Sequence, residues 1–221
     1  MTASKIRDDV ELITETGIVA IVRAAAASID QLLAAADAVK AGGVNAIEVT
    51  LTTPGALNVI SEAAHRYGSD VLFGAGSVLD AESARAAILA GAQFIVCPTL
   101  NLKLIELCKR YSVPVMPGAF TATEILTAWE AGADWVKLFP ATIGGAGYVK
   151  AIKAPLPHVK LAAVGGINLN NTAEFIRAGA EIVGIGNDLL NQQLLENGDY
   201  EAITDRARQF RQQVEIGRSQ K

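Results

Sequence analysis

Histidine, cysteine and aromatic side chains are scarce in this sequence. It contains two histidines, His65 and His158, two cysteines, Cys97 and Cys108, and 5% aromatic residues. Neither histidine belongs to a catalytic triad or a metal-binding pair, and the cysteines stand apart from any histidine cluster. We therefore expect no metal site and no disulfide framework, and two isolated cysteines suit a reducing cytoplasm.

Positive charge and long apolar runs are also lacking. The formal net charge is -4, which gives no basic surface to hold nucleic acid or an anionic membrane. The first nine residues lack the apolar core of a signal peptide, and no apolar run is long enough to span a bilayer. The expected partner is a small molecule, with no nucleic acid and no membrane, and the expected location is the cytoplasm.

Apolar residues are plentiful overall. Of the 221 residues, 51% are hydrophobic and 19% are charged, so the chain can bury a large core. Its length suits one barrel domain spanning residues 1–221.

An Ala-Gly pair followed by an apolar run recurs four times along the chain. Glycine just past the last helical turn accepts the left-handed conformation that ends a helix, so each pair predicts a helix-to-strand turn. The pairs Ala41-Gly42, Ala90-Gly91, Ala131-Gly132 and Ala178-Gly179 precede predicted strands at 46–49, 94–96, 135–137 and 182–184. Four more apolar runs, at 17–22, 71–73, 113–116 and 159–164, lie between them.

Eight apolar strands alternating with helices predict a parallel sheet covered by helices, either a closed barrel or a doubly wound sheet. Eight evenly spaced units favour the α/β fold of a (β/α)₈ TIM barrel. Residues 8–16 are predicted to form an extra N-terminal helix, and residues 200–216 the last helix.

Active sites of such barrels lie at the carboxyl ends of the strands. The polar residues and glycines near the predicted ends are Arg23, Glu48, Thr50, Ser77, Thr99, Thr121, Lys137, Gly165, Gly166 and Asn187.

Lys137 is the most informative of these residues. It stands in the apolar run 135–140, where an unpaired ammonium would be costly. Burial favours the neutral amine, which is the form that attacks a ketone to give a Schiff base. The alternative is a buried structural ion pair with Glu48 or Asp134.

Glu48 is a second isolated charge, placed among β-branched neighbours on the same strand face as Thr50. If that face points inward it meets Lys137, and a carboxyl in a partly dry site can transfer protons. An ionised Glu48 would instead keep the lysine charged, and a core salt bridge remains the alternative.

Glycines gather at the last two strand ends. Gly165-Gly166 and Gly186-Asn187 could present backbone N–H groups to a phosphate or carboxylate. The same glycines are equally compatible with tight turns that bind nothing.

These residues belong to a series of motifs that resembles the 2-keto-3-deoxy-6-phosphogluconate (KDPG) and 4-hydroxy-2-oxoglutarate (KHG) aldolase family along nearly the whole chain. The matching segments are residues 18–23, 43–51, 74–78, 117–118, 136–140 and 165–167. The resemblance implies a class I aldolase without cofactor, in which Lys137 forms the Schiff base and Glu48 transfers protons. It also implies a homotrimer.

By the same resemblance, other side chains surround the keto acid. They are Arg23, Thr50, Ser77, Pro98 and Phe139.

Four positions depart from the family pattern. They are Thr52 where many members have Arg, Ser77 for Thr, Val164 for Thr and Asn187 for Ser. Together with Asp188, whose charge would repel a phosphate, these changes leave open whether the substrate is phosphorylated.

There are four alternative functions. The same lysine enamine would arise in oxaloacetate decarboxylation or in cleavage of a non-phosphorylated keto acid. A metal-assisted aldolase lacks the required ligand cluster. A non-catalytic barrel could bind an anion through its glycine-rich strand ends.

Overall fold

The computed structural model describes residues 3–23 and 27–220, with side chains from residue 8 onward in these ranges. The strands are β1 Ile18–Val22, β2 Ala46–Thr50, β3 Leu72–Gly76, β4 Phe94–Val96, β5 Val115–Met116, β6 Gly118–Ala119, β7 Val136–Leu138, β8 Leu161–Val164 and β9 Ile182–Ile185. The helices are α1 Ala3–Thr16, α2 Ile29–Ala41, α3 Ala56–Tyr67, α4 Ala81–Leu89, α5 Leu102–Arg110, α6 Ala122–Glu130, α7 Ala141–Lys153, α8 Thr172–Arg177, α9 Gln192–Asn197 and α10 Tyr200–Ser219.

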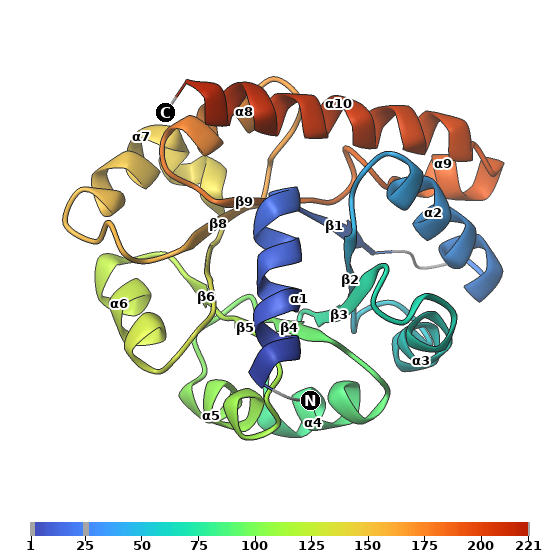
Figure 1. Cartoon of the computed structure of the whole chain (residues 1–221), viewed down its shortest axis with the longest axis horizontal. Coiled ribbons are helices and arrows are strands. Elements are labelled where there is room, and N and C mark those ends of the chain that lie inside the picture. Colours follow the sequence, from blue (N-terminus) through green and yellow to red (C-terminus); the bar gives the residue numbers. More distant parts are fainter. Residues whose placement is uncertain (1–2, 24–26, 221) are drawn as a thin grey trace.

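The strands form one parallel sheet in the order β5-β4-β3-β2-β1-β9-β8-β7-β6. Its two end strands, β5 and β6, follow each other in the chain and are separated only by Pro117, so the sheet is a nearly closed barrel ringed by helices (Figure 1). The predicted TIM barrel is therefore confirmed.

The fifth barrel strand differs from its prediction. Instead of one run over 113–116, it consists of β5 paired with β4 and β6 paired with β7. Pro117 lies between the two pieces, and because it has no N–H it cannot donate to the ladder. This interruption is why nine strands are observed where eight were expected.

The helix-to-strand turns follow the predicted Ala-Gly pairs. Gly91, Gly132 and Gly179 have φ angles of 108°, 95° and 115°, and at the first pair it is Gly43, with φ 87°, that takes this conformation. Each lies just beyond a helix end, where a residue without Cβ turns the chain back toward the sheet.

Strand alternation separates two cores. Side chains on the outer face of the strands, such as Val136 and Leu138, pack against the helices. Side chains on the inner face, such as Trp135 and Ala162, pack inside the barrel. The two polar side chains Glu48 and Lys137 are also on the inner face and lie above this apolar interior.

Helix α1 covers the amino-terminal end of the barrel and crosses its opening in Figure 1. Its Ile13 is fully buried in the interior cluster, and the indole N–H of Trp135 donates to Thr14 Oγ1 at 3.2 Å. The predicted extra helix at 8–16 is confirmed and begins earlier, at Ala3.

Helix α10 ties α1 in place. Arg218 donates to the carbonyl oxygens of Thr14 and Glu15, at 2.6 and 2.7 Å, and Arg211 donates to that of Thr16. The predicted last helix, 200–216, extends to Ser219, and the short helix α9 before it was not predicted.

Among the described residues, no helix combines the length and hydropathy needed to cross a membrane.

Candidate active site

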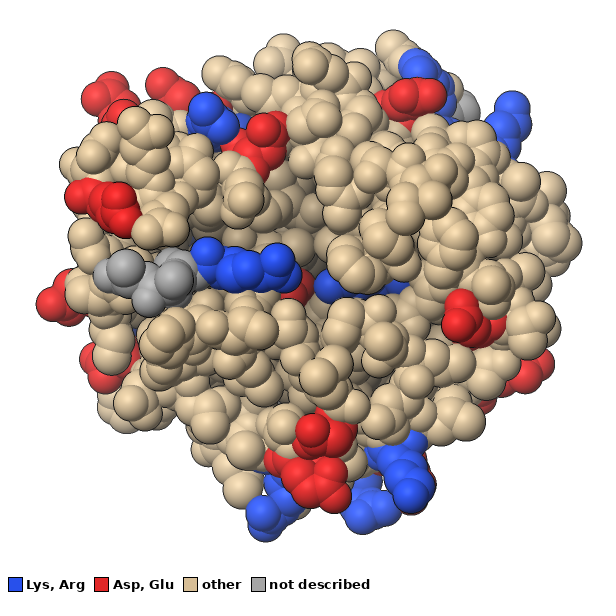
Figure 2. Space-filling view, turned by 180° about the vertical axis from the view of Figure 1, so that it is seen from behind, with Lys and Arg blue, Asp and Glu red and all other residues tan. Residues whose placement is uncertain are grey.

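A cavity of about 430 Å³ opens at the carboxyl ends of the strands, on the face opposite α1. Figure 2 shows that face, where basic side chains and an acidic side chain lie in a central hollow. The cavity is lined by Ile21, Arg23, Glu48, Ser77, Pro98, Lys137, Phe139, Val164, Gly165, Gly166, Ile167, Asn168, Gly184, Gly186, Asn187 and Asp188.

Lys137 reaches the cavity from the middle of β7, where the register places it between Gly118 of β6 and Ala162 of β8. The side chain is 5% exposed. Its Nζ lies 5.0 Å from the centre of the Phe139 ring, within the range of a cation–π contact. The amine is thus confined between an aromatic face and the open space of the cavity.

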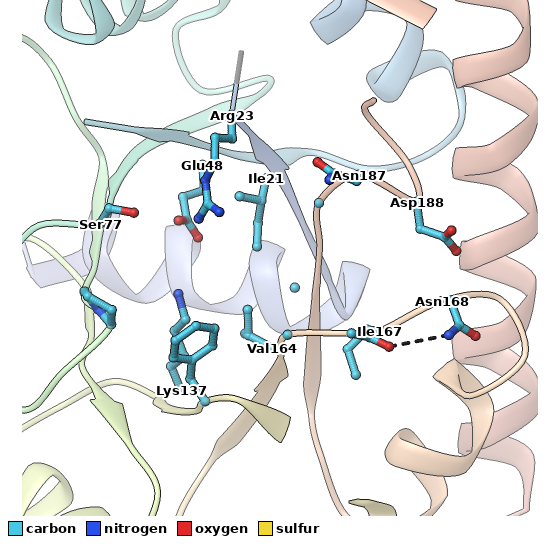
Figure 3. A pocket seen from close by; sticks show the side chains of 16 residues that line it. Ile21, Arg23, Glu48, Ser77, Lys137, Val164, Ile167, Asn168, Asn187 and Asp188 are labelled. Atoms are coloured by element: carbon cyan, nitrogen blue, oxygen red, sulfur yellow. Dashed lines mark hydrogen bonds between the residues drawn. The ribbon is translucent and has the colours of Figure 1, made fainter. Parts of the chain in front are cut away.

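Glu48 reaches the same space from β2 and is 2% exposed. In Figure 3 its carboxyl and the Lys137 amine point toward one another, with Arg23 beside Glu48. Burial raises the pKa of the Glu48 carboxyl, although the positive charges of Lys137 and Arg23 act in the opposite direction. A carboxyl of this kind keeps its proton to a higher pH than an exposed glutamate does and can give it up when a base is needed.

The structural ion pair considered for Lys137 does not form among the described residues. Asp134 instead pairs with Lys109, at 3.2 Å, and accepts the Val115 N–H at 2.9 Å. Lys137 and Glu48 interact across the cavity without a salt bridge. The space between them remains open to a ligand.

The cavity contains ten of the eleven predicted site residues. The exception is Thr50, which is fully buried and whose hydroxyl lies 2.9 Å from that of Thr52 and 3.3 Å from that of Thr53. Thr50 therefore stabilises the turn after Glu48 and does not contact the cavity. Two other strand-end residues do not line the cavity either. Thr121 is the N-cap of α6, where its hydroxyl accepts the Glu124 N–H, and Thr99 is exposed.

Several lining residues were not among the predicted site residues. Ile21 could have been found from alternation, because it lies two residues before Arg23 on β1. Asn168 and Ile167 could not, because their positions depend on the turn at Gly165 and Gly166, which have φ angles of 96° and 76°. The Asn168 amide donates to the Gly166 carbonyl at 3.4 Å (Figure 3).

The charges that line the cavity are unevenly distributed. Lys137, Glu48 and Arg23 lie at one end, whereas Asp188 lies at the other, near the neutral amide of Asn168 (Figure 3). The described residues contain no group of three or more His, Cys, Asp or Glu side chains placed to hold a metal ion. The end that holds Lys137 therefore offers an amine, a carboxyl and a guanidinium to a small anionic ligand.

Comparison with known proteins gives consistent matches. A family model described as KDPG and KHG aldolase matches residues 10–206. The chain is 40% identical to the 2-dehydro-3-deoxy-6-phosphogalactonate aldolase of Escherichia coli over 72% of this chain and 78% of that protein. It is 38% identical to the 2-dehydro-3-deoxy-phosphogluconate aldolase of Treponema pallidum over 79% and 83% of the two chains.

The structure is also similar to that of KDPG aldolase from Legionella pneumophila, with a TM-score of 0.83 and 27% identity over 90% of this chain and 96% of that chain. In that structure pyruvate is captured as a covalent carbinolamine intermediate.

Proposed function

The chain belongs to the KDPG and KHG aldolase family, and from this premise we propose that it cleaves 2-keto-3-deoxy-6-phosphogluconate, 4-hydroxy-2-oxoglutarate or both. The products are pyruvate and an aldehyde, glyceraldehyde 3-phosphate or glyoxylate. It is a class I aldolase, and therefore a lyase. The observation that carries the proposal is the pair of buried side chains, Lys137 and Glu48, that face each other across an open cavity.

Lys137 acts as the nucleophile. Its neutral amine adds to the C2 ketone of the substrate to form a carbinolamine. Protonated Glu48 donates its proton to the departing hydroxyl, so that water leaves and an iminium forms. The raised pKa of Glu48 supports this step, because it keeps a larger fraction of the carboxyl protonated than for an exposed glutamate.

Glu48 then acts as the base. As a carboxylate it accepts the proton of the C4 hydroxyl while the C3–C4 bond breaks, and the bonding electrons flow into the iminium to give an enamine. The aldehyde departs. Glu48 returns the proton to C3, and hydrolysis of the resulting pyruvate iminium releases pyruvate and restores the amine of Lys137.

Arg23 is placed to bind the substrate carboxylate. It lies beside Glu48 in the cavity (Figure 3), and a guanidinium can bind a carboxylate through two parallel hydrogen bonds. Ser77 lies on the same side (Figure 3), Pro98 lines the cavity with its backbone against Gly118, the strand neighbour of Lys137, and Phe139 lies against the Lys137 amine. This end accommodates the three carbons that become pyruvate.

The opposite end receives the part of the substrate that becomes the aldehyde. Asn187 and Asn168 lie at that end (Figure 3), and the lining glycines Gly165, Gly166 and Gly186 can offer backbone N–H groups to a phosphate or carboxylate. The neighbouring Asp188 carboxylate would repel a phosphate.

A panel of substrates tests whether the substrate carries a phosphate at this end. The 2-keto-3-deoxy-6-phospho acids of gluconate and galactonate, 4-hydroxy-2-oxoglutarate and oxaloacetate are each assayed for pyruvate release.

Trapping tests the covalent step. Borohydride reduction in the presence of pyruvate should fix a three-carbon adduct on Lys137, located by peptide mass spectrometry. Lys137→Ala should abolish both the adduct and turnover, whereas Lys150→Ala, at an exposed position on α7, should retain both. Absence of an adduct from the unmodified protein would contradict the proposed mechanism, and binding without turnover would favour an anion-binding barrel.

We also propose that the protein assembles as a homotrimer. Two exposed leucines support self-association: Leu79, in the loop after β3, is 60% exposed, and Leu102, the first residue of α5, is 50% exposed. The two segments adjoin, because Asn101 donates to the Leu79 carbonyl at 3.0 Å. Sedimentation equilibrium should give three times the chain mass, and a single-chain mass would refute the assembly.

A further inference from the structure

Gly76, the last residue of β3, lies directly against the Glu48 side chain. A Cβ built on Gly76 would stand 1.8 Å from Glu48 Oε1, 2.3 Å from Cδ and 2.4 Å from Cγ. Real Cβ atoms essentially never come within 3.0 Å of another heavy atom. The Glu48 carboxyl therefore occupies the space that any other residue at position 76 would fill.

Backbone conformation does not explain this glycine. Gly76 is not among the glycines with positive φ, so its backbone is one that other residues adopt. Glycine within a strand weakens the strand, and it commonly marks a close approach by another group. Here the approaching group is the Glu48 carboxyl.

The surroundings of Glu48 increase the importance of this contact. No hydrogen bond from another described side chain fixes its carboxyl. The charged groups that face it are Lys137 from β7 and Arg23 after β1; the Cys97 thiol after β4 packs in the outer core and is close enough for its pKa to be affected by Glu48. Without close packing on the β3 side, the two positive groups would draw the carboxylate out of its place.

We propose that Gly76 is a positioning residue for the aldol cleavage: it leaves the space that holds the Glu48 carboxyl apart from Lys137 and within reach of the substrate hydroxyl. This inference rests on the proposed function, since it assigns Glu48 the proton transfers. With Gly76→Ala, a shift of Oε1 from 1.8 to 3.0 Å from the new Cβ requires a movement of roughly 1.2 Å. The movement is away from β3 and into the cavity, which Lys137 and Arg23 also line.

Kinetics of Gly76→Ala test the proposal. We expect kcat for pyruvate release to fall about 100-fold, because misplacement of a catalytic group by about 1 Å has effects of this size. The rate at which the methyl protons of pyruvate exchange with deuterium should fall by a similar factor, because Glu48 is proposed to transfer that proton. The acid limb of the pH profile should move to lower pH, because the displaced carboxyl lies closer to Lys137 and Arg23. Gly147→Ala, whose Cβ meets nothing within 4 Å, is the matched control and should change none of these.

A double-mutant cycle with Glu48→Ala separates positioning from a general requirement for glycine. If Gly76 acts through Glu48, Gly76→Ala should cause no further loss of proton exchange or thermal stability in the Glu48→Ala background. An equal loss in both backgrounds, or an unchanged kcat and pH profile for Gly76→Ala alone, would refute the inference. Borohydride trapping of pyruvate on the unmodified protein is measured in parallel. Its failure would refute the proposed function, whereas its success with a fully active Gly76→Ala variant would refute only the role of Gly76.

Discussion

Removal of the Trp135 side chain would test whether the apolar interior supports the reactive lysine. Trp135 is fully buried, lies two residues before Lys137 with the same inward parity, and its N–H donates to Thr14 of α1. Truncation of a buried tryptophan to alanine costs about 3–5 kcal/mol. For a protein of this size each kcal/mol lowers Tm by about 2–4 °C, so Trp135→Ala should lower Tm by roughly 10 °C.

The same substitution should reduce activity, because the cavity left beneath Lys137 allows its amine to move; we expect kcat to fall about tenfold or more. Trp135→Phe retains most of the packing and loses the hydrogen bond to Thr14, so its cost should be about 1–2 kcal/mol. It provides a folded variant should the alanine variant fail to fold. Differential scanning calorimetry and steady-state kinetics measure both effects.

Trp129→Ala is the matched control for Trp135→Ala. Trp129 is only partly buried and its ring lies 6.2 Å from that of His158, edge to face. We expect a small change in Tm and an unchanged kcat. Equal loss of stability in the two variants, or full activity in a strongly destabilised Trp135→Ala, would refute the idea that the barrel interior positions Lys137.

Three further predictions follow from the side chains of the cavity and its surroundings. Glu48→Gln should lower kcat about 10²–10⁴-fold while pyruvate still forms a reducible adduct. Because burial raises the pKa of Glu48, the activity of the unmodified enzyme should decline with falling pH at a higher pH than for an ordinary glutamate, and this limb should be absent from the pH–rate profile of Glu48→Gln. Burial also raises the pKa of Cys97, and that of Cys108 to about 12, so iodoacetamide should label neither thiol until the protein unfolds, as followed by intact mass.

The strands and the facing pair were accessible from the sequence because they leave local signals. An isolated charge inside an apolar strand, as at Lys137 and Glu48, is rare enough to indicate a special environment, and alternation indicates which face it shares. The break at Pro117 also had a local cause, but the apolar run before it concealed the second piece of the strand.

Other features depend on three-dimensional contacts that the sequence does not display. Thr50 shares the inward face of Glu48, yet its hydroxyl is engaged within the following turn. Asn168 reaches the cavity only because of the glycine turn before it. The closeness of Gly76 to Glu48 comes from the pairing of two strands and the direction of one side chain, and the residue type at position 76 alone could not reveal it.

The proposed reacting groups and the residues at the opposite end of the cavity lie on separate parts of the backbone. Lys137 and Glu48 belong to strands of the barrel wall, whereas Asn168, Asn187 and Asp188 belong to the connections after β8 and β9. If the proposed roles hold, exchange of those two connections with equivalents from another barrel should alter which aldehyde is accepted and leave the bond-breaking residues in place. Directed evolution for new carbon–carbon bond formation has, in these few residues, a compact region to randomise.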